Sequence, residues 1–168
     1  MDFESLYEKY APVVRRFALF LSGDAMMADD ITSDTFVRAL GAHERIRELT
    51  VKSYLLMIAR NVYRDLQRRE WRKMKLDEHK ADAKISAQAH MEQKEEVKAV
   101  LAALQTLSEI DRTILLMRAL DEMPYEEIAA ALDIEVTTAK VKVHRARAKL
   151  MEVRNPAREK LAASGEKL

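Results

Sequence analysis

The chain has 168 residues, of which 29 are basic and 28 acidic, and it contains no cysteine. The absence of cysteine excludes disulfide bonds and thiolate metal sites. Helix-forming residues dominate and there are only three glycines and three prolines, so we predict an all-α fold with one domain or two small ones. The apolar runs are too short for a membrane span, and the polar start MDFESLYEKY lacks the pattern of a signal peptide. We therefore expect a cytoplasmic protein without membrane insertion.

Three amphipathic helices are predicted in the first 70 residues, because apolar side chains recur there at gaps of three and four. They begin near residues 2, 26 and 51. The break Ser22-Gly23-Asp24 separates the first two helices, and Gly41 is placed as a C-terminal stop for the second. Pro12 lies inside the first helix, where we expect a kink.

The second predicted helix contains an acidic cluster, formed by Asp29, Asp30 and Asp34 in the stretch ADDITSDTF. Asp30 and Asp34 are four residues apart and therefore share a helix face. Carboxylate pairs can bind a metal or act as acid and base, but no cluster of histidine, cysteine or glutamate accompanies them. We interpret this cluster as a docking surface for a basic partner protein, not as a catalytic or metal site.

The third predicted helix contains a row of arginines at intervals of four, namely Arg60, Arg64, Arg68 and Arg72. Each guanidinium can bind phosphate oxygens through two parallel hydrogen bonds, so the row suits a nucleic-acid backbone. Three aromatic residues lie among the arginines, namely Tyr54, Tyr63 and Trp71. They could stack on unpaired bases, or they could be core residues, and the sequence leaves both alternatives open.

Residues 70–96 are polar and without a sustained apolar stripe, so they could form a solvated helix or an extended linker. Periodicity returns at Val97, and Ser108-Glu109-Ile110-Asp111 resembles a capping box that opens the next helix. Pro124 marks the start of a short helix over 125–132. A connection over 133–136 then leads into a last long helix, which we expect to end at Asn155-Pro156.

A short helix, a tight connection and a longer basic helix are typical of a helix-turn-helix motif. The last helix begins TTAKVKVHRARAKL, with no acidic residue between 137 and 151. In such a motif the second helix enters the major groove of DNA, where basic side chains contact phosphates and base edges. We therefore predict that this helix binds DNA, although a merely solubilising basic surface is the alternative reading.

Together these segments resemble a bacterial RNA polymerase sigma factor of the extracytoplasmic function group. ADDITSDTFVRAL is similar to the family's polymerase-docking segment, and SYLLMIARNVYRDLQRRE to its promoter-melting and −10 recognition helix. The stretch from LSEIDRTILLMRAL to VTTAKVKVHRARAKL is similar to the family's −35-reading domain. The resemblance implies a sigma region 2 domain over 1–70, a linker over 71–96, a region 4 helix-turn-helix domain over 97–154 and a flexible tail over 155–168.

The resemblance also implies which residues have which roles. Docking on polymerase is assigned to Asp29, Asp30, Asp34, Phe36 and Arg38. The loop 41–48 lies where the family captures a flipped −10 base, and −10 contacts are assigned to His43, Arg45, Arg60, Asn61, Arg64 and Arg68. Contacts to −35 DNA are assigned to Thr138, Lys140, Val141, Lys142, Arg145 and Arg147. Ser33, Val141, Asp133 and Glu135 depart from the residues that the family commonly has at their positions.

The partners implied by the resemblance are core RNA polymerase, through its β′ clamp helices and β flap, promoter DNA and an anti-sigma factor. No enzyme activity or cofactor is expected, because glycine-rich phosphate loops are absent and the four histidines are scattered. Two alternatives remain at this point. A sigma-like decoy would bind an anti-sigma factor instead of DNA, and a conventional helix-turn-helix regulator would leave the acidic cluster and the arginine row unexplained.

Overall fold

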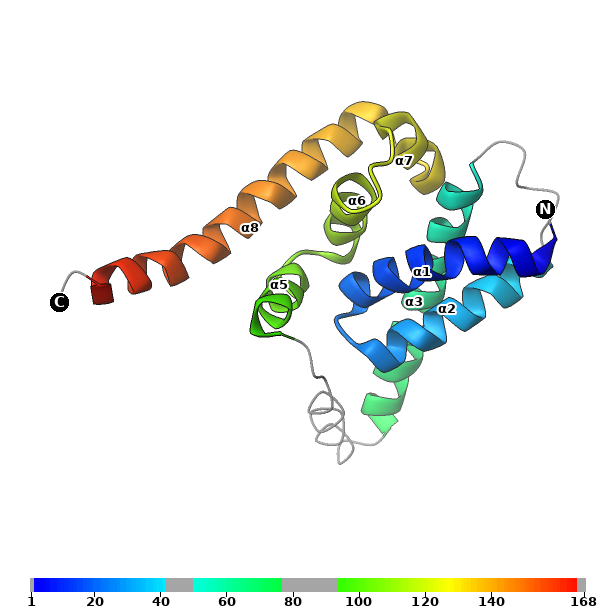
Figure 1. Ribbon diagram of the computed structural model, residues 1–168, viewed down its shortest axis with the longest axis horizontal. Coiled ribbons are helices and arrows are strands. Elements are labelled where there is room, and N and C mark those ends of the chain that lie inside the picture. Colours follow the sequence, from blue (N-terminus) through cyan, green and yellow to red (C-terminus); the bar gives the residue numbers. More distant parts are fainter. Residues whose placement is uncertain (1, 42–49, 77–93, 166–168) are drawn as a thin grey trace.

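The computed structural model describes residues 2–41, 50–76 and 94–165, and within these ranges every regular element is a helix (Figure 1). The predicted all-α class is therefore confirmed. The N-terminal unit consists of α1 (Phe3–Ser22), α2 (Ala25–Leu40) and α3 (Val51–Leu76). The C-terminal unit consists of α5 (Glu95–Gln105), α6 (Glu109–Ala119), α7 (Tyr125–Leu132) and α8 (Val136–Gly165).

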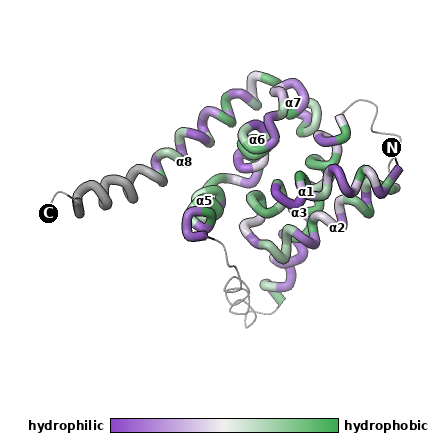
Figure 2. Tube along the Cα trace, in the orientation of Figure 1, coloured by the Kyte–Doolittle hydropathy of each residue, from purple (hydrophilic) through white to green (hydrophobic). Residues whose placement is uncertain are grey.

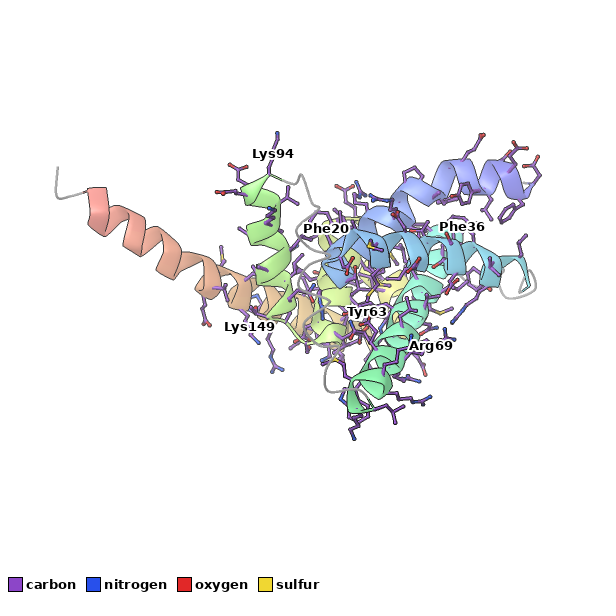
Figure 3. All side chains as sticks on the ribbon, turned by 90° about the horizontal axis from the view of Figure 1, so that it is seen from below. Phe20, Phe36, Tyr63, Arg69, Lys94 and Lys149 are labelled. Carbon is purple, nitrogen blue, oxygen red and sulfur yellow. The ribbon has the colours of Figure 1, made fainter. Side chains whose placement is uncertain are left out.

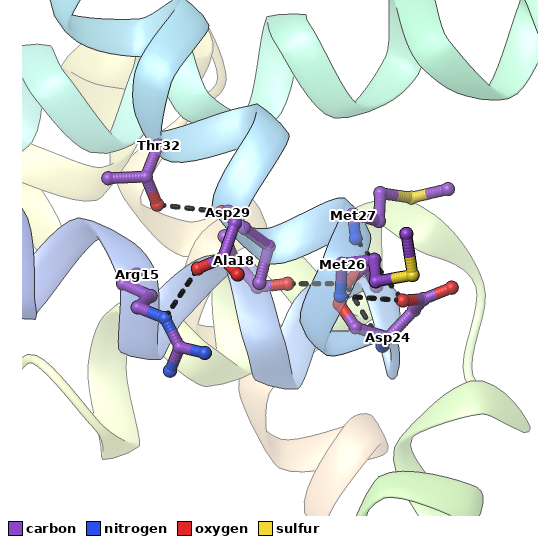
Figure 4. Close-up of polar contacts among 9 residues, drawn as sticks. Arg15, Ala18, Asp24, Met26, Met27, Asp29 and Thr32 are labelled. Carbon is purple, nitrogen blue, oxygen red and sulfur yellow. Dashed lines mark hydrogen bonds and ion pairs between the residues drawn. The ribbon is translucent and has the colours of Figure 1, made fainter. Parts of the chain in front are cut away.

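The turn between α1 and α2 has the predicted break at residues 22–24. Gly23 ends α1 in the left-handed conformation, with φ of 72°, and its amide donates to the carbonyl of Leu19. Asp24 then caps α2, because its carboxylate accepts hydrogen bonds from the amides of Met26 and Met27 (Figure 4). Gly41 ends α2 as predicted but has φ of −84°, so this end does not depend on glycine's access to positive φ.

The core of the N-terminal unit is formed by the inward stripes of its three helices. Its largest fully buried side chains are Val14, Phe17, Leu21, Ile31, Phe36, Leu55, Leu56 and Val62. Tyr54 is 3% exposed and Tyr63 is 4% exposed, and Tyr63 lies among the crowded side chains between the helices in Figure 3. Both tyrosines are therefore core residues, which excludes base stacking for them in this arrangement. Trp71 is 59% exposed and lies under the ammonium group of Lys75.

The C-terminal unit has the predicted helix-turn-helix geometry. Ser108 caps α6 by accepting a hydrogen bond from the amide of Asp111, as the capping box predicts. Asp133 ends α7 with φ of 54°, a conformation that aspartate tolerates better than most residues. Small and branched residues of α7 and α8 close the motif's core, and the fully or nearly fully buried ones are Ile128, Ala139, Val143 and Ala146.

The end of α8 differs from the prediction. The helix does not stop at Asn155-Pro156 but continues to Gly165, and this extension projects away from the other helices in Figure 1. Proline removes one backbone donor but has a φ that suits a helix, and the residues after it, AREKLAA, are mostly strong helix formers. Pro12 similarly lies within the continuous helix α1.

The two units pack against each other, with α1 against α5 and α6 and with α3 against α7 (Figure 1). Buried residues from both units belong to one contiguous apolar cluster. Along the coloured part of each helix hydrophobic and hydrophilic positions are interleaved (Figure 2). No helix in the described ranges is both long and apolar enough to cross a membrane.

Candidate functional site

The acidic cluster lies on the outer face of α2. Asp29, Asp30 and Asp34 are all exposed. Asp29 accepts a hydrogen bond of 2.7 Å from Nε of Arg15 in α1 (Figure 4), so part of its charge is already balanced. Asp30 and Asp34 share a face and point to solvent. Within the described ranges, no group of three or more His, Cys, Asp or Glu side chains is arranged so that it could hold a metal ion.

Phe36 is placed differently from the other predicted docking residues. Its side chain is 2% exposed, and its ring packs edge-on against Tyr7 at 4.9 Å and against Phe3 at 6.3 Å. The prediction of a direct partner contact by Phe36 therefore fails in this arrangement, because the ring anchors α2 on α1. Arg38 lies at the surface and forms an ion pair of 3.0 Å with Asp65 of α3.

A shallow groove of about 370 Å³ runs between α1 and α2, beside the acidic cluster. It is lined by Tyr7, Ala11, Pro12, Arg15, Asp29, Thr32 and Ser33. Sequence reasoning did not find it, because its walls come from two helices and no motif marks them.

The arginine row of α3 is divided between the interior and the surface. Arg60 is half-buried, and its guanidinium donates to both carboxylate oxygens of Glu109 in α6, at 2.7 and 3.1 Å. Asn61, Arg64 and Arg68 are exposed, and Arg68 lies 3.9 Å from Asp65. Of the −10 contacts predicted on α3, Asn61, Arg64 and Arg68 are therefore at the surface, and Arg60 is not. His43 and Arg45 lie outside the described residues, as does most of the loop 41–48.

The outer face of α8 presents most of the predicted −35 contacts. Lys140, Val141, Arg145 and Arg147 are exposed, whereas Thr138 and Lys142 are half-buried. The ammonium group of Lys142 is 3.5 Å from the carboxylate of Asp111 in α6, and that of Lys140 lies over the ring of Tyr125. Lys149 continues this basic helix at the rim of the molecule (Figure 3). The face is basic and open, as a DNA-binding helix requires.

The contact between the two units also contains polar groups that the sequence did not reveal. Asp121, in the turn after α6, is buried and accepts a hydrogen bond of 3.2 Å from Arg16 of α1. The ammonium group of Lys52 donates to the backbone carbonyl of the same residue at 2.7 Å. Burial raises the pKa of Asp121 above its ordinary value, and the hydrogen bond from Arg16 and the charges of Lys52 and Arg16 only partly offset that effect.

Comparison with known proteins agrees with this arrangement. The Sigma-70 region 2 family model matches residues 6–73, and the Sigma-70 region 4 model matches residues 98–150. The chain is 31% identical over 140 residues to the ECF RNA polymerase sigma factor EcfG of Rhodopseudomonas palustris, covering 83% of this chain and 77% of that protein. It is 26% identical to the ECF RNA polymerase sigma factor SigM of Bacillus subtilis, covering 92% and 96% of the two chains.

Solved structures show the same fold. The sigma factor RpoE of Bartonella quintana, crystallised with the anti-sigma factor NepR, superposes with a TM-score of 0.74 at 22% identity, covering 92% of this chain and 97% of that one. CnrH, solved with the cytosolic domain of CnrY, superposes with a TM-score of 0.67 at 23% identity, covering 92% and 88% of the two chains. With both conserved regions matched in order, the chain belongs to the sigma-70 family, as a sigma factor of the extracytoplasmic function group.

Proposed function

We propose that the chain binds core RNA polymerase, directs it to promoters with −35 and −10 elements and promotes opening of the DNA for initiation. The observation that carries this proposal is the separation of charge on one molecule. An exposed acidic face on α2 and two exposed basic faces on α3 and α8 lie within regions that match sigma-70 regions 2 and 4.

Docking on polymerase is assigned to the outer face of α2. Asp30 and Asp34 are exposed and lie one turn apart, so they suit a basic helical surface such as the β′ clamp helices. Asp29 and Arg38 border this face but are each paired within the chain. Phe36 supports the face from beneath, and the C-terminal unit is assigned to the β flap.

Promoter recognition is assigned to the two basic helices. On α3, Asn61, Arg64 and Arg68 face solvent and suit the −10 backbone and unpaired bases. On α8, Arg145 and Arg147 suit phosphates and base edges of the −35 major groove, together with the predicted contacts Thr138, Lys140, Val141 and Lys142. Base capture during melting costs about a few kcal/mol and is assigned to the loop over 41–48.

Regulation by an anti-sigma factor is also proposed, since RpoE of Bartonella quintana, which shares this fold, was solved in complex with the anti-sigma factor NepR. The two alternatives make different predictions. A sigma-like decoy would bind the anti-sigma factor but neither polymerase nor DNA. A conventional helix-turn-helix regulator would bind duplex DNA in the absence of polymerase and would not need the acidic face of α2.

Binding to core polymerase separates these functions directly. Purified chain is mixed with core RNA polymerase at equimolar concentration and passed over a sizing column, with the chain alone as a control. Stoichiometric co-elution supports the sigma assignment. Complete separation of the two, with a folded chain, would reject it and favour the decoy or the conventional regulator.

A further inference from the structure

Two lysines near the start of α8 are held on opposite flanks of that helix. Lys140 and Lys142 are two residues apart in the sequence, which corresponds to about 200° around a helix axis. The ammonium group of Lys140 is 5.8 Å from the ring centre of Tyr125, the first residue of α7. The ammonium group of Lys142 is 3.5 Å from a carboxylate oxygen of Asp111, in the first turn of α6. Each lysine is therefore held by a different neighbouring helix.

The outer face of α8 lies between these two flanks. It includes Val141 and Arg145, which are exposed, and it lies opposite the stripe of α8 that packs into the core. A helix with its side chains is about 10–12 Å across, and the major groove of DNA is about 12 Å wide. When the outer face is seated on base edges, the two flanks therefore come near the phosphates of the two strands. Lys140 and Lys142 suit these phosphates, and the residues between them suit base edges.

Tyr125 holds Lys140 without neutralising it. The face of an aromatic ring attracts a cation, but the ammonium group keeps its charge for a phosphate. The ring itself is partly buried against the core, and the guanidinium of Arg118 lies 4.6 Å from its centre. Nη1 of Arg118 in turn donates to the carbonyl of Met123 at 3.1 Å. Tyr125 is thus a fixed platform, and a lysine that rests on it loses less freedom when it binds a phosphate.

Asp111 holds Lys142 in a chemically different way. Its carboxylate balances the charge of the ammonium group, and the two side chains are 29% and 31% exposed. A phosphate can bind Lys142 only by taking the place of this carboxylate. The pair on this flank therefore opposes DNA binding, whereas the ring on the other flank favours it.

From these contacts we propose that Tyr125 is a positioning residue that holds Lys140 ready for a DNA phosphate, and that Asp111 restrains Lys142 from a phosphate of the other strand. This inference deepens the proposed function and rests on its assignment of α8 to duplex DNA. Tyr125 and Asp111 act only through the two lysines. Removal of the ring should therefore weaken DNA binding, and removal of the carboxylate charge should strengthen it.

The test uses the full chain and a fluorescein-labelled duplex of mixed sequence, because contacts to phosphates do not depend on sequence. Affinity is measured by anisotropy at salt concentrations between about 50 and 200 mM. Lys140→Ala and Lys142→Ala should each reduce the slope of log affinity against log salt by about 0.9, as expected for the loss of one phosphate contact. Circular dichroism verifies that each variant is folded.

Tyr125→Leu should weaken binding by about threefold, in line with a cation–ring contact at a partly exposed site. Tyr125→Phe keeps the ring and should bind like the wild type. In a Lys140→Ala background Tyr125→Leu should have no further effect, because the two residues act as a pair. In an Arg147→Ala background, which removes an exposed charge elsewhere on α8, the threefold effect should remain.

Asp111→Asn should strengthen binding by about threefold relative to its control, as expected for a partly exposed ion pair. The control is Glu126→Gln, which removes one negative charge from an exposed position of the same unit. In a Lys142→Ala background the difference between Asp111→Asn and Glu126→Gln should disappear. This comparison does not depend on any change at Tyr125, so it tests the inference even if Tyr125→Leu is unfolded.

Three results would overturn the inference. The first is equal binding by Tyr125→Leu and Tyr125→Phe, and the second is a Tyr125→Leu effect that persists without Lys140. The third is an Asp111→Asn chain that binds no more tightly than the Glu126→Gln control. A failure of the proposed function looks different, since a chain that shows all the predicted affinities but does not co-elute with core polymerase would lose the sigma assignment and keep the placement of the two lysines.

Discussion

The guanidinium of Arg60 and the carboxylate of Glu109 are joined by two hydrogen bonds across 49 residues of sequence. Hydrogen bonds to charged groups contribute about 1.5–3 kcal/mol, and this pair is largely shielded from solvent. The pair therefore contributes to the packing of the two units and leaves Arg64 and Arg68 as exposed members of the arginine row.

Replacing Arg60 tests that contribution. We expect Arg60→Ala to lower the free energy of unfolding by about 1–3 kcal/mol, because Glu109 loses its charged partner while still half-buried. Arg64→Ala, one turn further along α3 at an exposed position, should change the free energy of unfolding by less than about 0.5 kcal/mol. Urea denaturation followed by circular dichroism measures both. Equal effects of the two substitutions would mean that the Arg60–Glu109 pair does not stabilise the fold.

Charge reversal on α2 tests the docking face. Asp30→Lys with Asp34→Lys should weaken binding to core polymerase by about 2–5 kcal/mol, since it places like charges against a basic surface. Both residues are exposed, so the helical content and unfolding midpoint should stay near those of the wild type. The measurement is a titration of labelled chain with core polymerase.

Glu4→Lys with Glu8→Lys is the matched control for that titration. It reverses two exposed charges one turn apart on α1 and should leave polymerase affinity within about threefold of the wild type. An Asp30→Lys/Asp34→Lys chain that binds as well as this control would remove the polymerase-docking assignment from α2.

Two substitutions on α8 test the −35 face. Lys142→Ala with Arg145→Ala should reduce transcription from promoters with an intact −35 element by about tenfold or more, since loss of a single base-edge contact costs about 1–3 kcal/mol. The existing ion pair between Lys142 and Asp111 is partly exposed and should therefore be easily exchanged for a phosphate. Lys9→Ala with Lys98→Ala removes two exposed charges from α1 and α5 and should have little effect. Wild-type activity that is equal on intact and scrambled −35 elements would contradict the assignment.

Asp121 should make stability depend on pH. Its pKa in the folded protein is raised above the ordinary 3.8 by burial, so the folded state holds the proton more tightly than the unfolded state. The free energy of unfolding therefore falls as pH rises from about 3.8 through the folded-state pKa, and the cost of the buried charge is fully present above it. Asp121→Asn lacks this titration, so its stability relative to the wild type should increase over that window and then remain constant.

Unfolding in urea at a series of pH values between about 3 and 7 measures this difference. Oδ2 of Asp121 has no hydrogen-bond partner among the described residues. The Asp121→Asn substitution therefore replaces a buried carboxylate, one oxygen of which lacks a donor, by a neutral amide. If the free energy of unfolding changes with pH in the same way for the wild type and the variant, the Asp121 carboxyl has the same pKa in the folded and unfolded states, which would contradict this prediction.

Local features were predictable from the sequence because they depend on neighbouring residues. The break at Gly23, the cap at Ser108 and the helix-turn-helix after Pro124 follow from residues within a few positions of each other. The predicted end of α8 at Asn155-Pro156 is wrong, because the helix-forming residues that follow Pro156 outweigh the cost of a single proline.

The features that were missed depend on contacts between distant segments. Arg60 has the same spacing as the exposed Arg64 and Arg68, and only the position of Glu109 on α6 distinguishes it. Phe36 lies in an acidic, surface-like stretch, yet the helix face on which it lies turns towards Tyr7. The burial of Asp121 could not be inferred either, since its partner Arg16 is 105 residues away in the sequence.

The most direct test of the sigma assignment is transcription by core RNA polymerase on a library of promoter fragments, with and without the purified chain. The start sites of the transcripts are mapped by sequencing. We predict initiation only when the chain is present, at fragments that share two sequence elements upstream of the start site. Transcripts that are identical in number and position with and without the chain, despite a folded protein, would contradict the account.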